Sequence, residues 1–143
     1  MYLKPMTIVV IAMAFPMIGK AELNVSYYKN GLVTIRKNYE ETNKKISGEI
    51  LKLSSEANQK LILEMQSCYV KEFQERVEHI SNTIKEYEQS LQTEESKEMH
   101  DQILVKSREL ISFSKLSINI LADKVRAFDS ADNEKIKNFI RSQ

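Results

Sequence analysis

The sequence predicts an all-α protein, an elongated bundle of three long helices followed by a short C-terminal helix. After about residue 27, apolar residues recur at helical spacing almost everywhere, and no stretch alternates strictly enough between apolar and polar residues to form a strand. Beyond the first 21 residues the chain has no proline and only two glycines, Gly31 and Gly48, so little interrupts a helix. Long helices that each carry one apolar stripe bury it by packing against one another at about 20°.

The first 21 residues are predicted to be a cleaved secretory signal peptide. One basic residue, Lys4, precedes an apolar run over residues 7–15, and small residues follow before the expected cut between Ala21 and Glu22. The alternative is a retained membrane anchor, but the run is shorter than the roughly 20 residues that a bilayer span requires. We therefore expect a periplasmic or secreted protein that is not stably inserted in a membrane.

Residues 22–143 are predicted to form a single domain, because 122 residues suffice for one modest core. Without Lys4 and Lys20, this part has 19 basic and 20 acidic residues and a formal net charge of −1. A near-neutral chain argues against a nucleic-acid partner, which favours a basic stripe on the protein.

The first helix is expected at about residues 27–53. Its charged residues include favourable pairs four positions apart, such as Glu40 with Lys44. The apolar stripe that defines it comprises Leu32, Ile35, Tyr39, Ile46, Ile50 and Leu53.

The second helix is expected at about residues 56–91, after a capping sequence at residues 54–56 that offers hydroxyl groups and an acid. At 1.5 Å per residue it would be roughly 54 Å long. Its stripe is the clearest in the chain and alternates steps of three and four as a coiled-coil seam does: Tyr69, Phe73, Val77, Ile80, Ile84, Tyr87 and Leu91.

The third helix is expected after a break at residues 92–95, where Thr93 can cap it, although a continuous helix through this point is the alternative. Its predicted seam comprises Leu104, Ser107, Ile111, Ser114, Ile118, Leu121, Val125 and Phe128. A second capping sequence at residues 129–132 predicts the end of this helix and the start of the short C-terminal one, which carries Ile136, Phe139 and Ile140.

The sequence predicts no catalytic, cofactor-binding or metal-binding residue. If the second and third helices fold back at residues 93–94, the only two histidines, His79 and His100, lie roughly 12 Å apart along the bundle and cannot share an ion. The spacing Cys-x-x-Cys-His that attaches haem is missing, as are a glycine-rich phosphate loop and a nucleophile elbow.

Cys68 is the single cysteine, so an exported chain cannot form an internal disulfide bond. We expect its thiol to be buried beside the apolar stripe, because free cysteine is among the most buried residue types. The alternative is a disulfide bond to a partner or to a second copy, which leaves a homodimer open.

These observations favour protein recognition as the class of function. Tyr27 and Tyr28, next to the new N-terminus, are the predicted partner contacts together with Cys68, since aromatic residues are enriched at protein interfaces. Immunity or inhibitor proteins and accessory factors of secretion machines have this compartment and size. The alternatives are a periplasmic chaperone, and an exported small-ligand binder or enzyme with a polar pocket between helices.

That pocket would be built from Ser107, Arg108 and Ser114 on the third helix. Hydroxyl groups within a seam either allow helices to approach closely or line a polar cleft. Close packing is the interpretation we favour.

Overall fold

The computed structural model describes residues 25–89 and 95–142, and within the second range the side chains of 97–129 and 137–142. The described residues form three long helices, α1 (Val25–Ile50), α2 (Glu56–Gln89) and α3 (Glu95–Arg141). The predicted all-α, elongated bundle is thus confirmed, and no strand occurs in this part of the chain.

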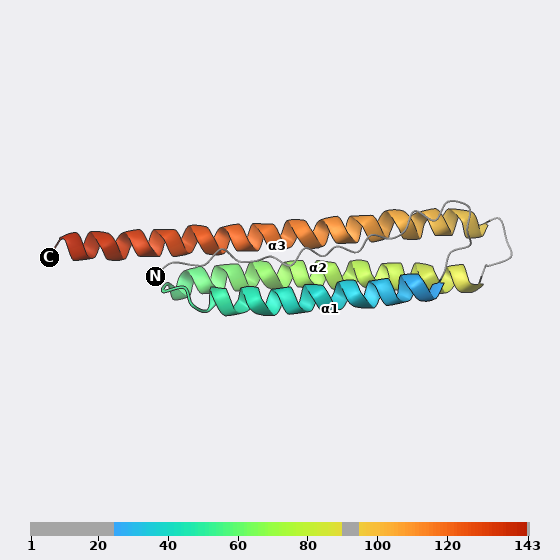
Figure 1. Ribbon diagram of the computed structural model, residues 1–143, viewed down its shortest axis with the longest axis horizontal. Helices are drawn as coiled ribbons and strands as arrows, with labels where there is room; N and C mark the ends of the chain where they lie inside the picture. Colours follow the sequence, from blue (N-terminus) through green and yellow to red (C-terminus); the bar gives the residue numbers. More distant parts are fainter. Residues whose placement is uncertain (1–24, 90–94, 143) are drawn as a thin grey trace.

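The three helices lie side by side along one long axis (Figure 1). Helix α2 runs antiparallel to both α1 and α3, so α1 and α3 run parallel to each other, and every pair of helices is in contact. Contacts between Tyr69 and Phe113 and between Tyr87 and His100 define the register of α2 against α3. With a rise of 1.5 Å per residue in both helices, this register puts the start of α2 level with about residue 128 of α3.

The α1–α2 connection is short and capped at both ends. Helix α1 closes with tight turns, in which the amides of Lys52 and Leu53 donate to carbonyl groups three residues earlier, at 3.2 and 3.1 Å. Ser55 is the N-cap of α2, because its hydroxyl accepts from the amide of Asn58 at 3.3 Å. The predicted capping sequence at residues 54–56 therefore acts where it was expected.

The core runs along the bundle where the apolar stripes of α1, α2 and α3 pack together. At its centre the ring of Tyr39 on α1 stacks on Phe73 of α2, with centroids 3.9 Å apart. The hydroxyl groups of Tyr39 and Ser117 are 2.9 Å apart, which joins α1 to α3. The large side chains that are fully buried include Tyr28, Ile35, Tyr39, Ile46, Ile50, Ile62, Ile80, Ile84, Ile103, Leu110, Ile118 and Leu121.

The predicted seam of α3 is right at Ser107, Ser114, Ile118, Leu121 and Val125 and wrong at two positions near its start. Ile118 and Val125 are buried as expected, but in the first turns Ile103 and Leu110 are buried while Leu104 and Ile111 are only half-buried. A straight α-helix drifts by about 20° for every seven residues, so a strict seven-residue series turns away from its neighbours within two or three repeats. Counted back from Ile118, the seven-residue series therefore lies toward the edge of the buried face at Ile111 and Leu104.

The C-terminal segment is helical, as predicted, and forms the end of α3, which continues through residues 129–132 to Arg141. Since the α1–α2 hairpin ends near the level of residue 128, residues 129–141 project beyond it (Figure 1). We call this part the α3 overhang. None of the described helices is long and apolar enough to cross a membrane.

Candidate functional site

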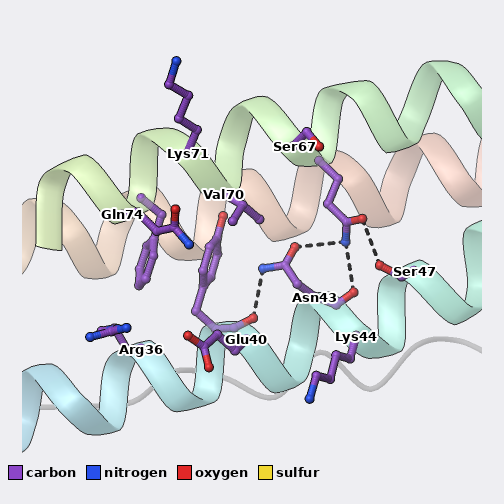
Figure 2. Close-up of a pocket in the computed structure, with 12 residues that line it drawn as sticks. Arg36, Glu40, Asn43, Lys44, Ser47, Ser67, Val70, Lys71 and Gln74 are labelled. Atoms are coloured by element: carbon purple, nitrogen blue, oxygen red, sulfur yellow. Dashed lines mark hydrogen bonds between the residues drawn. The ribbon is translucent and has the colours of Figure 1, made fainter.

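A groove of about 400 Å³ runs between α1 and α2 near the middle of the bundle. Figure 2 shows that both helices contribute side chains to it. We call it the α1–α2 groove, and its lining residues are Arg36, Tyr39, Glu40, Asn43, Lys44, Ser47, Gln66, Ser67, Val70, Lys71, Phe73 and Gln74.

The base of the groove is mostly apolar. The stacked rings of Tyr39 and Phe73 form it, and the half-buried side chain of Val70 lies beside them. Stacked rings that are held in the core cannot rearrange without disturbing the packing, because protein interiors are close-packed. The groove is therefore preformed.

A polar network crosses the groove at one end (Figure 2). The side-chain amide of Gln66 on α2 donates to the backbone carbonyl and the side-chain carbonyl of Asn43 on α1, at 2.9 and 3.1 Å. Ser47 donates to Gln66 Oε1 at 2.9 Å, and Asn43 Nδ2 donates to the carbonyl of Tyr39 at 2.9 Å. Both amide groups are buried, and these bonds satisfy them within the protein, so the network joins the two helices.

Burial raises the pKa of the Tyr39 phenol, and hydrogen bonds with Ser117 and Asn43 oppose this rise only in part. A phenol whose pKa lies above its ordinary value of 10 is neutral at physiological pH. Tyr39 therefore acts here as a packing and hydrogen-bonding group rather than as a base.

The rim of the groove is charged, with a surplus of cations. Arg36, Lys44 and Lys71 are exposed there, with one acid, Glu40. In Figure 2 the two lysines extend away from each other on opposite sides of the groove. The entrance thus remains open between them.

The predicted contact residues Tyr27 and Tyr28 lie far along α1 from this groove. Their rings contact each other edge to face, with centroids 5.6 Å apart, and Tyr28 also contacts His100. Tyr28 is only 1% exposed, so its ring packs in the core, and its predicted contact with a partner stays a prediction. It lies four residues before Leu32 and extends the stripe by one turn; a partner contact of the half-buried Tyr27 stays a prediction.

Cys68 is exposed, so the prediction that its thiol is buried is wrong. The apolar residues near Cys68 in the sequence do not all lie on the stripe, since Leu61 is exposed and the buried positions of this part of α2 are Ile62 and Gln66. Cys68 instead lies in a shallow hollow on the surface of α2, with Glu64 and Leu63.

The polar pocket considered for α3 is not formed by its three residues. Ser107 and Ser114 are buried, and Ser114 donates to the carbonyl of Leu110 at 2.7 Å, whereas Arg108 is exposed. The two hydroxyl groups are out of reach of a ligand. They allow the close packing that the sequence favoured.

The histidines belong to separate contacts. His79 contacts Lys106, and His100 lies near Tyr28 and Tyr87. Within the described ranges, no group of three or more histidine, cysteine or acidic residues could hold a metal ion.

Sequence reasoning missed the groove, although one signal was present. The first stripe steps by seven from Tyr39 to Ile46, and the skipped position four residues after Tyr39 is Asn43. A polar residue at a core position requires a partner, because burying an unpaired amide is costly. That partner, Gln66, comes from a different helix, so no local pattern identifies it.

No protein-family model matches the chain, and no curated protein or solved structure is similar enough to it to count as a match. A function must therefore be argued from the geometry of the chain's own residues.

Proposed function

We propose that this protein binds another protein and that the α1–α2 groove is the contact site. The observation that carries the proposal is the open, preformed groove, in which the apolar base is available to a partner while the polar groups already bond one another. Such a base favours an apolar side chain of a partner over a polar small molecule, which would have to displace the bonds of the network.

The dimensions of the groove suit a helix. On α1 the lining residues extend from Arg36 to Ser47, which is about three turns or roughly 16 Å. A helix that packs into a groove uses side chains three, four and seven residues apart, so about ten residues would fill this one. We infer that the partner presents a short amphipathic helix.

The rim favours a partner with acidic residues. Arg36, Lys44 and Lys71 outnumber Glu40, and charges at the edge of an interface mainly set the association rate and the specificity. Because exposed charges are screened by salt, association should slow as the ionic strength rises.

The role proposed here is binding without catalysis. Asn43, Ser47 and Gln66 hydrogen-bond one another, and Tyr39 stays protonated, so these residues supply no free base or nucleophile. With the predicted signal peptide removed, the protein would act in the periplasm or outside the cell, as an immunity or inhibitor protein or a secretion accessory factor does. A chaperone is the alternative, and it would bind many partners.

Site-specific photocrosslinking in the native cell tests this proposal. A photoreactive amino acid replaces Ser67 or Gln74, two exposed lining residues, and Lys115 on the exposed surface of α3 serves as the control position. We expect one dominant adduct of the same mass from both groove positions and none from the control position. Many adducts would indicate a chaperone, and adducts that do not differ between groove and control would refute the proposal.

Charge reversal sharpens the same experiment. Arg36→Glu with Lys71→Glu should remove most of the adduct, whereas Lys97→Glu with Lys115→Glu applies the same charge change away from the groove and should leave it in place. Circular dichroism of each variant checks that the bundle stays folded.

A further inference from the structure

The two ends of the α1–α2 groove differ in chemistry. At one end the base is the ring stack of Tyr39 and Phe73. At the other end lies the polar network of Asn43, Ser47 and Gln66 (Figure 2). A partner helix that fills the groove therefore contacts an apolar surface at one end and a hydrogen-bonding surface at the other.

The orientation of the Gln66 side-chain amide is determined by its neighbours. Its nitrogen lies within reach of two oxygens, the backbone carbonyl and the side-chain carbonyl of Asn43, at 2.9 and 3.1 Å. Turning the amide over would set oxygen against oxygen, so the nitrogen must occupy this place. Both amide hydrogens are thus donated within the protein, and the Gln66 oxygen accepts the hydrogen of the Ser47 hydroxyl at 2.9 Å.

Ser47 is the member of the network that a partner can reach. Asn43 and Gln66 are each 7% exposed, whereas Ser47 is half-buried and lines the groove. The hydroxyl hydrogen of Ser47 is donated to Gln66, so the lone pairs of its oxygen are what Ser47 offers to a partner. Ser47 can therefore accept a hydrogen bond from a partner, and it cannot donate one without breaking its own bond.

The charges of the rim decide which kind of donor suits this end. Lys44 is exposed three residues before Ser47 on the same helix, whereas Glu40, the acid among the lining residues, is seven residues away or roughly 10.5 Å along α1. Lys44 would repel an ammonium or guanidinium group of a partner, because like charges that meet at an interface disfavour association. A neutral donor, which is a side-chain amide or hydroxyl, fits beside Ser47.

The spacing of the two ends matches two turns of a partner helix. Tyr39 precedes Ser47 by eight residues and Phe73 follows Gln66 by seven, so the ends are roughly 11 Å apart along the bundle. Side chains seven residues apart lie on one face of a helix and span the same distance. An apolar residue of the partner can thus contact the ring stack while a residue seven positions away reaches Ser47.

We propose that Ser47 determines the specificity of the α1–α2 groove and that the partner helix carries a neutral hydrogen-bond donor seven residues from its apolar anchor. The inference rests on the proposed function, because it requires a helix in the groove. It distinguishes that helix from other amphipathic helices. An apolar side chain at the donor position would remove water from the Ser47 oxygen without supplying a hydrogen bond.

Fluorescence anisotropy with synthetic helical peptides of about 15 residues tests the proposal. The peptides share acidic flanking residues and a leucine anchor, and they differ only at the position seven residues after the leucine. Glutamine at that position supplies a neutral donor, methionine has nearly the same shape without a donor, and lysine supplies a charged donor. We expect the glutamine peptide to bind about fivefold or more tightly than the methionine peptide, and the lysine peptide to bind more weakly than the glutamine peptide.

A combined variant of the network should reverse this preference. Asn43→Leu, Ser47→Ala and Gln66→Leu together replace the network by apolar groups, so the methionine peptide should bind this variant more tightly than the glutamine peptide. The control Ser67→Ala removes an exposed hydroxyl of the lining and should leave the preference for glutamine unchanged. Circular dichroism checks that each variant is folded. The comparison of the two peptides on the wild-type protein decides the matter even if the combined variant does not fold.

Equal affinities of the glutamine and methionine peptides for the wild-type protein would overturn the proposal, as would a failure of every peptide to bind. Binding that Arg36→Glu with Lys71→Glu does not weaken would place the peptides outside the groove and would also contradict it. One dominant crosslink from Ser67 and Gln74, combined with no preference for glutamine, would leave the proposed function standing and refute only the role of Ser47.

Discussion

Leu121 and Phe139 lie on the same face of the same helix, and their surroundings are opposite. Leu121 is 0% exposed between α1 and α2, whereas Phe139, five turns later, is 65% exposed. The apolar stripe is similar in both places, and only the neighbouring helices differ (Figure 1). An apolar stripe thus shows which face of a helix can be buried by packing. The length of the neighbouring helices decides whether the same chain covers that face.

The largest expected difference in the free energy of unfolding comes from truncating one side chain in each of the two regions. Leu121→Ala should lower the free energy of unfolding by about 2–5 kcal/mol, because it leaves a cavity in a packed core. Phe139→Ala should change it by less than about 0.5 kcal/mol, since an exposed ring makes few contacts. Urea unfolding measures both, and equal losses would show that the overhang is packed within one chain.

The sequence predicted the helices and their order because local patterns determine them. Stripe spacing and the caps near Ser55 and Glu95 placed each described helix end within about three residues, apart from the end of α3. The end of α3 differs because the capping sequence at residues 129–132 does not interrupt the helix. Capping residues favour a break without enforcing one, and no proline or glycine lies there to enforce it.

The groove and the overhang could not be predicted in the same way, because both depend on how helices are placed relative to each other. Asn43 meets Gln66 only because α1 and α2 pack in one register, and Cys68 is exposed only because the stripe of α2 passes through Ile62 and Gln66. Phe139 is predictable as an apolar stripe residue. Its exposure follows from the length of α3 relative to the hairpin.

A smaller loss of stability is expected when the polar network between α1 and α2 is broken. Gln66→Ala should cost about 1–3 kcal/mol of unfolding free energy, because it leaves the buried carbonyl groups of Asn43 without their donor. Gln74 lines the same groove but is exposed, so Gln74→Ala should cost less than about 0.5 kcal/mol. If thermal unfolding gave the two variants the same stability, water would replace the network without loss.

Tyr39→Phe is expected to cause the smallest loss of unfolding free energy at neutral pH. This loss should also depend most on pH. The change keeps the ring stack on Phe73 and removes the hydrogen bond between Tyr39 and Ser117, while Ser117 still donates to the carbonyl of Ser114 at 3.2 Å. A loss of about 1 kcal/mol at pH 7 is therefore expected.

At high pH the difference between wild type and Tyr39→Phe should shrink. Burial raises the pKa of Tyr39 above its ordinary value of 10, so the folded state favours the neutral phenol. The stability linked to this preference is fully present below pH 10 and is lost as the pH rises from 10 through the higher folded-state pKa. The variant has no phenol at this position and keeps its stability over that range.

Burial and the neighbouring Tyr27 also raise the pKa of Tyr28. Tyr28→Phe should therefore reduce the fall in unfolding free energy over the same pH range, and the double variant should reduce it most. Urea titrations from pH 7 to above pH 10 measure the slopes, and parallel slopes for all four proteins would mean that neither phenol stays neutral because of the fold.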